Sequence, residues 1–342
     1  MIDRFETWLS AQLWRQWSYR GPLAAAMFPL SLAYAGLSEW NRSRQERARR
    51  DTMIPARAVI VVGNLTVGGS GKTPMTVWLA RRLASAGYRP GIVSRGYGGR
   101  GDVAGIVVTP DSDPVVVGDE PLLIAQRTGV PVQVDRDRVR GARALTERGV
   151  DVVIADDGMQ HHRLPRDITI LMVDGRRRFG NGLCLPAGPL REPRSARGRA
   201  DFVLVTGGEP EAADEIPMEL VPSSRLQRVD GSGEGRKPGR FARRRVHAVA
   251  GIADPERFFR MLEGAGIEVI RHPFPDHHRF LQHQIRFDDD LPVLMTEKDA
   301  VKCRSFAEDN HWCWPIAASV PPTFESALLA RLETVSRLKY LG

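Results

Sequence analysis

The stretch VGNLTVGGSGKTP, residues 62–74, constrains the fold more than any other part of the chain. A short apolar run, residues 58–62, leads into it, and an amphipathic run, residues 73–86, follows it. A glycine-rich segment between a strand and a helix is typical of a phosphate-binding loop, in which backbone N–H groups at a helix N-terminus converge on phosphate oxygens. The sequence therefore predicts a strand, a nucleotide-binding loop and a helix in immediate succession.

The loop departs from the pattern G-x-x-x-x-G-K-S/T at one position, because Thr66 stands where the first glycine is expected. Thr66 fits if its φ angle is negative. The groups that touch phosphate are present, since Lys72 supplies positive charge and the Thr73 hydroxyl is a ligand for Mg²⁺. The alternative is a glycine-rich turn that binds nothing. The predicted ATP-binding residues are Thr66, Gly68, Gly69, Ser70, Gly71, Lys72 and Thr73.

Short apolar runs alternate with amphipathic helical runs along most of the chain, which predicts an α/β fold with parallel strands. The pattern weakens between residues 209 and 245, and a second, shorter alternation follows. We expect a phosphate-loop domain at 51–215, a linker or hairpin at 216–245 and a smaller α/β domain at 246–342. The run WCWPIAASV, residues 312–320, is expected to be a strand of the smaller domain.

Composition narrows the class of protein. The chain has 342 residues, a formal net charge of +8, 42% hydrophobic residues and 26% charged residues. These fractions argue against a disordered or fibrous chain. The positive charge favours acidic partners, but no segment interleaves basic and aromatic residues as a nucleic-acid-binding module does. The three cysteines form no C-x-x-C pair, so we expect reduced thiols and no zinc site.

An apolar segment without a charged residue, residues 21–37, lies near the N-terminus. Tryptophans stand on both sides of it, and the basic run RSRQERARR, residues 42–50, comes after it. These features are typical of a helix in a membrane interface, but a helix packed on the protein's own core has a similar apolar pattern. Both interpretations of the segment 1–50 stay open at this point.

Polar residues follow several predicted strands, where ligands gather in open α/β sheets. Asp156 and Asp157 end the apolar run DVVIADD, and a carboxylate there is the expected second contact of Mg²⁺ beside a phosphate loop. A helix cap or an exposed turn is the alternative for this pair. Each remaining candidate is weak when taken alone. They are Arg95 in SRGYGGR, Asp119 in GDEP, His161 in DDGMQHHR, Arg191 and Glu192 in LPAGPLREP, His277 in PFPDHHRF and the segment TEKDAVKC.

Together these segments resemble the tetraacyldisaccharide 4'-kinase family of the lipid A pathway. The matching stretches run in the family's order from residue 62 to residue 302 and include GDEPLLIA, DDGMQHHRLPRD, FPDHHRF and TEKDAVK. In this family Ser or Thr tends to stand at the position of Thr66, and Phe often at that of Met159. The resemblance implies two α/β/α sandwich domains joined by a short two-stranded linker, the first with a parallel sheet like that of phosphate-loop kinases, plus an N-terminal apolar helix.

The resemblance also implies the reaction and the roles of the site residues. The γ-phosphate of ATP would pass to the 4'-hydroxyl of a tetraacyldisaccharide 1-phosphate lipid, with Thr73 and Asp157 as the Mg²⁺ ligands. Asp156 and Asp157 match the family's acidic pair near the reacting phosphate. Asp119 and His277 match a pair that activates the acceptor hydroxyl, and this base would form only when the two domains close. The residues assigned to substrate binding are Arg95, His161, Arg191 and Glu192.

A lipid acceptor places the expected site of action at the cytoplasmic face of the inner membrane of a Gram-negative bacterium. The N-terminal segment would hold the chain there as a peripheral or monotopic protein. The expected partners are the lipid disaccharide and the anionic membrane surface, with no nucleic acid and no obligate protein partner.

A nucleotide-driven switch or metallochaperone with a deviant phosphate loop is the alternative, because the loop alone fits it nearly as well. The second domain with FPDHHRF argues against it, since a switch requires no separate acceptor-binding domain. ATP consumption with and without the lipid disaccharide separates the two. A membrane-tethered nucleic-acid binder rests on charge alone and would bind DNA or RNA with strong salt dependence.

Overall fold

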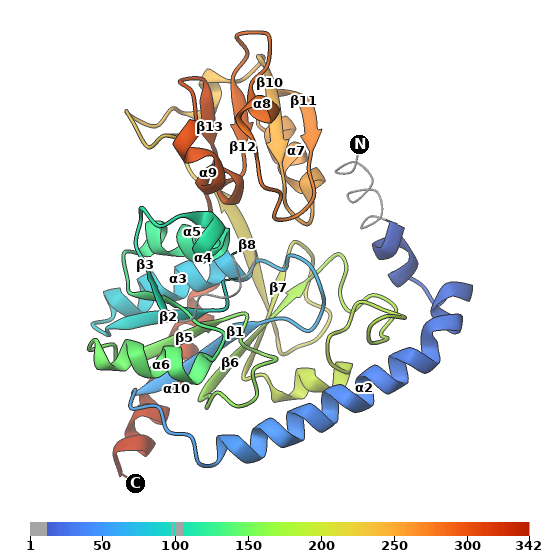
Figure 1. The fold of residues 1–342 in the computed structure, drawn as a ribbon, viewed down its shortest axis with the longest axis vertical. Coiled ribbons are helices and arrows are strands. Elements are labelled where there is room, and N and C mark those ends of the chain that lie inside the picture. Colours follow the sequence, from blue (N-terminus) through green and yellow to red (C-terminus); the bar gives the residue numbers. More distant parts are fainter. Residues whose placement is uncertain (1–11, 97–98, 100–104, 342) are drawn as a thin grey trace.

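The computed structural model describes residues 12–96, 99 and 105–341, so residues 1–11 of the predicted N-terminal segment lie outside the described part. Two β-sheets organise the described residues into a large and a small domain, one above the other in Figure 1. Hydrophobic clusters lie on both faces of each sheet, under covering helices. The structure therefore confirms the predicted α/β class with two layered domains.

The large sheet carries the phosphate loop. Its strands are β1 (Ala58–Gly63), β2 (Pro90–Ser94), β3 (Ile106–Val108), β4 (Val132–Val134), β5 (Val152–Asp156), β6 (Ile168–Asp174), β7 (Phe202–Thr206), β8 (Glu215–Pro222) and β14 (Ile316–Ser319). Their order is β14-β8-β7-β6-β1-β5-β2-β4-β3, and neighbours are parallel except at the edges, where β3 and β14 pair antiparallel. The central strand β1 is buried along its whole length, which explains its unbroken run of valine and isoleucine.

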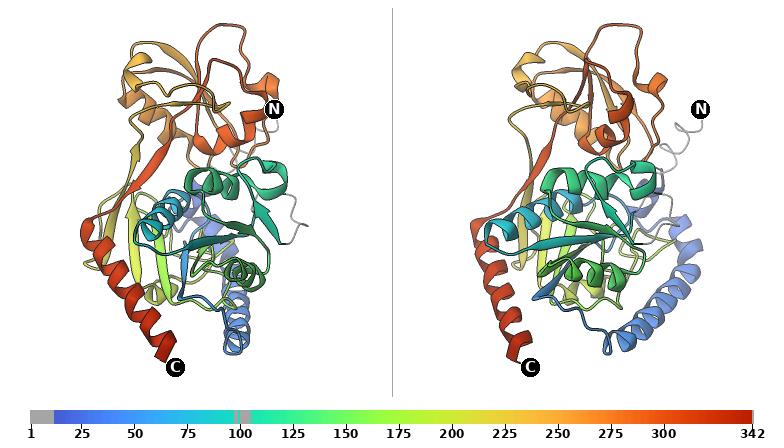
Figure 2. Two further views of the ribbon diagram at one scale, coloured as in Figure 1. Left: turned by 90° about the vertical axis from the view of Figure 1, so that its left-hand side faces the viewer. Right: turned by 60° about the vertical axis from the view of Figure 1, so that its left-hand side comes forward.

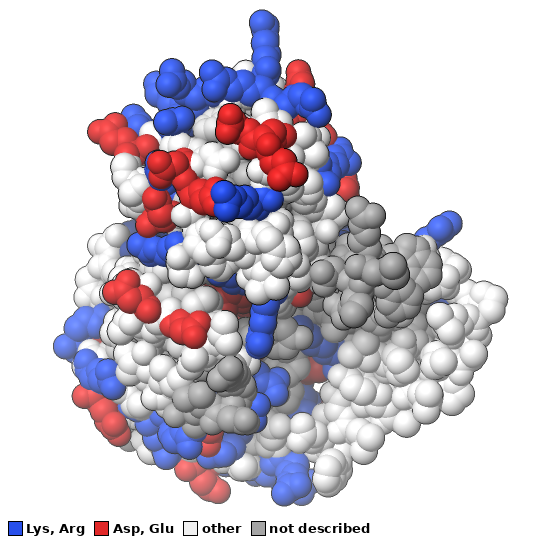
Figure 3. Space-filling view, turned by 45° about the horizontal axis from the view of Figure 1, so that its top comes forward, with Lys and Arg blue, Asp and Glu red and all other residues white. Residues whose placement is uncertain are grey.

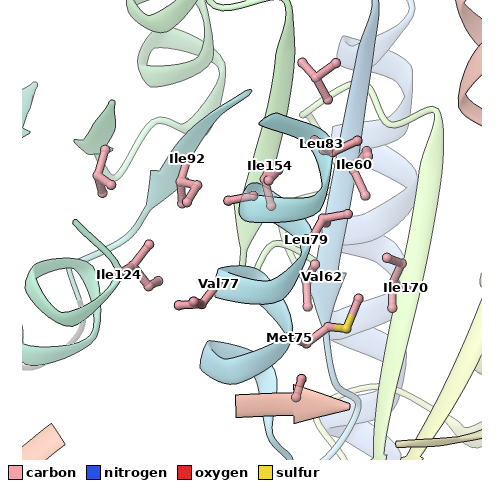
Figure 4. Packing of buried hydrophobic residues seen from close by; sticks show 14 of the residues in the cluster. Ile60, Val62, Met75, Val77, Leu79, Leu83, Ile92, Ile124, Ile154 and Ile170 are labelled. Carbon is pink, nitrogen blue, oxygen red and sulfur yellow. The ribbon is translucent and has the colours of Figure 1, made fainter. Parts of the chain in front are cut away.

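Helices cover the two faces of this sheet. Its helical elements are α3 (Lys72–Ser85), α4 (Pro114–Val117), α5 (Asp119–Thr128), α6 (Arg138–Glu147), α10 (Pro322–Leu341) and the 3₁₀-helix η1 (Arg194–Arg199). In Figure 4, Met75, Leu79 and Leu83 point from α3 toward Ile60 and Val62 of β1. Burying such side chains stabilises the fold by about 1.5–3 kcal/mol each. This packing fixes the N-terminus of α3, where the phosphate loop ends.

Helix α2 (Pro22–Arg49) runs along the outside of the large domain, as Figures 1 and 2 show. One face docks on the protein: the Ser31 hydroxyl donates to the Cys184 carbonyl at 2.8 Å, and the Tyr34 hydroxyl donates to the Arg191 carbonyl at 3.2 Å. Large apolar side chains elsewhere on α2 are exposed. Within residues 12–96, 99 and 105–341, no helix combines the length and the apolar character needed to cross a bilayer.

The small domain is built on a second sheet. Its strands are β9 (Gln227–Arg228), β10 (Arg245–Ala250), β11 (Glu268–Pro273), β12 (Val293–Met295) and β13 (His311–Cys313), in the order β11-β10-β12-β13-β9. Its helical elements are α7 (Pro255–Gly264), α8 (Gln282–Ile285), α9 (Glu297–Cys303) and the short 3₁₀-helices η2 (Pro238–Arg240) and η3 (Arg304–Phe306). Phe259 of α7 is buried in the cluster on one face, and Ile285 and Cys303 in that on the other.

Two strands connect the domains. β8 leads out of the large domain and β14 leads back, and they pair antiparallel from Ile316–Pro222 to Ser319–Glu219. This connection matches the two-stranded linker that the family resemblance implies.

The predicted domain boundaries differ from the structure toward the C-terminus. Strand β14 and helix α10 belong to the large domain, although the sequence pattern places all of 246–342 in the smaller one. The run 312–320 forms β13 and β14 in two different sheets, because Pro315 stands between them and cannot donate a ladder hydrogen bond. The expected linker 216–245 likewise contributes β9 to the small sheet.

Candidate active site

A cleft of about 1290 Å³ lies between the carboxyl ends of the large sheet's strands and the small domain. Figure 3 shows basic and acidic side chains on the walls of this hollow. The loops after β1, β2 and β5 line one side, and residues around α7 and α9 line the other. The predicted site residues in the lining are Gly68, Gly69, Ser70, Gly71, Lys72, Thr73, Arg95, Asp156, Asp157, His161, Arg191 and His277.

The phosphate loop enters α3 through backbone angles that favour glycine. Gly68 has a φ of +97° and Gly71 a φ of +82°. The N-cap residue of α3 is Gly71, which has no side chain to cap the helix, and the first turn of α3 carries no acidic residue. The first N–H groups of this helix of 14 residues therefore point at the cleft as an anion-binding end, and Lys72 adds a positive charge there.

Thr66 occupies the position of the missing glycine without strain. It is not among the described residues with a positive φ, and it is 7% exposed and forms an antiparallel bridge with Leu190. Asn64 Nδ2 donates to the Gly68 carbonyl oxygen at 3.2 Å and thereby closes the entry to the loop. Thr66 therefore holds the entry of the loop against Leu190 and, contrary to the prediction, does not line the cleft.

The two aspartates after β5 have different surroundings. Asp156 is buried and accepts a hydrogen bond of 2.9 Å from Thr76 Oγ1, and burial, reinforced by Glu120 and Asp157, raises its pKa to about 7. Asp157 lies 3.6 Å from Lys72 Nζ and 3.1 Å from Arg191 Nη1. Burial alone would raise the pKa of Asp157, but these two cations outweigh it and lower that pKa, so Asp157 ionises more readily than Asp156.

Arg138 lies behind the acid pair, and the sequence pattern does not reveal it. Arg138 is 3% exposed, and its guanidinium donates to the Asp156 carbonyl at 3.0 Å and the Asp135 carbonyl at 3.1 Å. Burial lowers the pKa of Arg138 to about 10. His161 lines the cleft nearby, and burial together with Arg138 lowers the pKa of His161 to about 4, so its imidazole is neutral at pH 7.

Arg191 and Glu192 point in different directions. Arg191 lines the cleft and pairs with Asp157. Glu192 is 2% exposed, pairs with Arg199 and accepts a hydrogen bond of 3.1 Å from Gln160 Nε2. The structure therefore brings Arg191 into the cleft and leaves Glu192 outside it, where Glu192 holds the cleft-lining Gln160.

Asp119 and His277 meet across the domain boundary. Asp119 begins α5 of the large domain, and His277 follows β11 of the small domain. Both carboxylate oxygens of Asp119 lie 3.1 Å from His277 Nδ1. Burial alone would raise the pKa of Asp119, but the hydrogen bond from His277 and the charge of Lys298 lower it. His277 has a φ of +61°, a rare conformation that places its ring in the cleft.

Two further charged residues join this pair. Lys298, in the first turn of α9, lies 3.1 Å from Glu120 Oε1 and 3.2 Å from His277 Nε2. Both Lys298 and Glu120 line the cleft. The segment TEKDAVKC points to the neighbourhood of Lys298, but nothing in the sequence pairs this lysine with His277.

The donor groups suit a magnesium–nucleotide complex better than a metal held by protein alone. Within the described residues, no three or more His, Cys, Asp or Glu side chains form a metal-binding cluster. Mg²⁺ commonly takes one or two carboxylates and completes its shell with phosphate oxygens and water. The ionised Asp157 and the Thr73 hydroxyl beside a phosphate loop fit this need. Ser70 Oγ is buried without a hydrogen-bond partner in the described residues and is available for a phosphate oxygen.

The chain is similar to known proteins over most of its length. A family model described as tetraacyldisaccharide-1-P 4'-kinase matches residues 23–333. The tetraacyldisaccharide 4'-kinase of Alkalilimnicola ehrlichii is 48% identical over 330 residues, which cover 94% of this chain and 97% of that protein. The protein of the same name from Stenotrophomonas maltophilia is 47% identical over 93% of this chain and 95% of its own length.

The fold is also similar to a solved structure. The structure is described as the "apo" form of LpxK from Aquifex aeolicus in complex with ATP. It matches with a TM-score of 0.75 and 27% sequence identity, over 91% of this chain and 99% of that chain.

Proposed function

The chain belongs to the tetraacyldisaccharide-1-P 4'-kinase family, and from this premise we propose how its residues catalyse the reaction. The protein is an ATP-dependent kinase of lipid A biosynthesis that phosphorylates a lipid disaccharide at its 4'-hydroxyl. Family membership sets aside the nucleotide-driven switch. The observation that carries the proposed mechanism is the 3.1 Å contact between Asp119 and His277, which line or border the same cleft as the phosphate loop.

The phosphate loop holds the nucleotide. The N–H groups of residues 68–73 bind phosphate oxygens, and the Ser70 hydroxyl adds a donor. Lys72 and Arg191 give up part of their pairing with Asp157 to neutralise the transferring phosphoryl group. Thr73 and Asp157 would hold Mg²⁺, which would supply charge neutralisation on the phosphates when bound.

The acceptor hydroxyl enters between the two domains. His277 Nδ1–H donates to Asp119, which fixes the tautomer that leaves the Nε2 lone pair for the hydroxyl proton. As that proton moves to Nε2, the acceptor oxygen attacks the γ-phosphorus in line and ADP leaves. Arg95 and His161 bind the acceptor from the large domain, and Glu192 acts indirectly by holding Gln160.

Transfer of labelled phosphate from ATP to the disaccharide 1-phosphate lipid tests this mechanism. Lys72→Ala removes charge at the phosphate, so we expect a loss of about 10²–10³-fold in kcat. Asp119→Ala and His277→Ala should each lower kcat by about 10²–10⁴-fold while ATP binding persists. Near-normal turnover by both folded dyad variants would exclude the base.

The acceptor is a lipid, so the enzyme must work at a membrane surface. We infer that α2 lies on the cytoplasmic face of the inner membrane of a Gram-negative cell, and that the protein is peripheral or monotopic. Six exposed side chains support this role: Leu23, Phe28, Leu30, Leu32, Leu37 and Trp40. The arginines at its C-terminal end, Arg42 to Arg50, suit an anionic surface.

A further inference from the structure

The ammonium group of Lys298 lies among the carboxylates around the Asp119–His277 pair. Its Nζ is 3.1 Å from Glu120 Oε1, 3.1 Å from Asp276 Oδ1 and 4.0 Å from Asp119 Oδ2. Burial alone would lower the pKa of Lys298, but Glu120 and Asp119 outweigh it and raise that pKa. Lys298 therefore remains an ammonium at neutral pH and can only donate hydrogen bonds.

This ammonium also fixes the protonation of the histidine. Lys298 Nζ lies 3.2 Å from His277 Nε2, and a donor-only group at this distance requires a lone pair on Nε2. The ring proton then resides on Nδ1, between the ring and Asp119. Lys298 and Asp119 thus select the same tautomer from opposite sides of the ring.

The two nitrogens leave a position for one oxygen. Nζ and Nε2 are 3.2 Å apart, so a hydroxyl oxygen at about 2.8 Å from both takes the place of their direct hydrogen bond: the N–H that faces Nε2 turns to the oxygen, and the Nε2 lone pair is left for the hydroxyl proton. Such a hydroxyl donates its proton to Nε2 and accepts a hydrogen bond from Nζ. A cation beside the oxygen stabilises the negative charge that develops when the proton leaves.

We propose that Lys298 is a further catalytic residue, which binds the acceptor hydroxyl oxygen and stabilises its developing charge during phosphoryl transfer. The role rests on the proposed base function of the Asp119–His277 pair. In the step, the O–H bond breaks with its proton passing to Nε2, the O–P bond to the γ-phosphorus forms, and the P–O bond to ADP breaks. Lys298 keeps its protons throughout.

A purely structural role is the competing explanation, because Lys298 also links the two domains through Glu120. The chain offers a matched control for this. Arg127 of α5 pairs with Glu297 of α9 at 2.5 Å, so Arg127→Met removes an ion pair from the same domain interface. Besides Glu297, Arg127 Nη1 contacts the Ile316 carbonyl oxygen at 3.3 Å. Arg127→Met therefore measures what the loss of one interdomain ion pair costs.

Steady-state kinetics of Lys298→Met give the first test. We expect kcat for lipid phosphorylation to fall by about 10²–10³-fold, as for other donors to a developing oxyanion, while the KM for ATP changes little. The acid limb of the pH profile should move to higher pH, because a cation that opposes protonation of Nε2 is gone. Asp119 and Asp276 still lie beside the ring, and Lys302 lies 3.9 Å from the Asp119 carboxylate. Arg127→Met should leave the acid limb in place.

Rescue by a small amine gives the second test. In Lys298→Ala, added ethylammonium should restore part of kcat because it carries N–H donors, whereas tetramethylammonium should not. Retention of ATP binding shows that the variant is folded. If Lys298→Met keeps a normal kcat and pH profile, or if ethylammonium and tetramethylammonium have the same effect on the kcat of Lys298→Ala, the catalytic role of Lys298 is excluded.

The variants distinguish a wrong assignment of the base from a wrong assignment of Lys298. If His277→Ala and Asp119→Ala lose activity while Lys298→Met does not, only the role of Lys298 is excluded. If the dyad variants also keep normal turnover, the base itself is excluded and the role of Lys298 goes with it.

Discussion

Lys72 Nζ lies 3.6 Å from Asp157 Oδ1, so the cation of the phosphate loop has a carboxylate partner within the protein. Arg191 contacts the same carboxylate at 3.1 Å. ATP must therefore compete with Asp157 for both cations. Asp157 would also be a ligand of Mg²⁺, whose charge would leave Lys72 and Arg191 available to the phosphates.

This competition predicts opposite effects of Asp157→Asn with and without metal. Without Mg²⁺ we expect ATP to bind the variant several-fold more tightly, because the cations lose a competing anion. With Mg²⁺ we expect kcat to fall by about 10²-fold or more. Calorimetry in a chelator and the kinase assay measure the two quantities. The gain in affinity should vanish in Asp157→Asn combined with Lys72→Met, and weaker metal-free binding by Asp157→Asn alone would contradict the account.

Two glycines of the loop should respond differently to a methyl group. Gly71 has a φ of +82°, and its Cβ would lie 3.1 Å from Met218 Cε. Gly71→Ala should therefore lower the free energy of unfolding by about 1–2 kcal/mol. The Cβ of Gly69→Ala would meet only Ala253 Cβ, at an ordinary 3.6 Å, so its effect should stay within about 0.5 kcal/mol. Urea unfolding of both variants checks this, and equal losses would refute it.

Buried His162 should make the fold sensitive to acid. Burial, with help from Arg166 and Arg199, lowers the pKa of His162 to about 3. In the unfolded chain His162 binds a proton below about pH 6.5, whereas in the folded protein it binds one only below about pH 3. The free energy of unfolding therefore falls as pH falls through this window. His162→Gln should remove this loss, by up to about 2 kcal/mol at pH 5.

Urea unfolding at about pH 7.5 and about pH 5 measures the effect. The exposed His283 provides the control, since His283→Gln should leave the pH dependence unchanged. An identical pH dependence in the wild type and His162→Gln would show that His162 does not contribute.

The exposed face of α2 should determine membrane partitioning. Leu30 and Leu37 are 59% and 66% exposed, and Leu30→Ser combined with Leu37→Ser should weaken binding to anionic vesicles at least about tenfold. Leu281 of the small domain is 59% exposed, so Leu281→Ser is a matched control that should bind as the wild type does. Co-sedimentation gives the bound fractions. Unchanged binding of the double variant, or equal losses in both, would argue against a membrane role for α2.

The sequence predicts those parts of the site whose signals are local. Gly71, Lys72 and Thr73 stand at the head of a helix, and Asp156 and Asp157 end an apolar strand, so each signal lies within a few neighbouring residues. The place of β14 is different. Its apolar residues predict a strand but not which sheet it joins, because its partner β8 lies far away in the chain.

The role of Lys298 in the site is likewise not predictable from the sequence, because its partners are distant in the chain. In the sequence it is one lysine near the start of a helix, where a solvated side chain is the common outcome. Its contacts to Glu120 and His277 arise only when α5 and α9 face each other across the domain boundary. Glu192 shows the reverse case, because its position beside Arg191 suggests a place in the cleft, but its side chain turns into the protein.

The return of the chain through β14 has a consequence for synthesis on the ribosome. Translation delivers β14 and α10 only after the whole small domain has emerged, yet both complete the large domain that the earlier strands began. Until then, the edge of β8 and the apolar surface that Phe324 and Leu328 cover remain open to solvent. An open strand edge is a template for pairing with other chains. A nascent chain that stalls within the small domain thus exposes the edge of β8 to pairing with other chains. Only translation through α10 covers this edge and the apolar surface beside it.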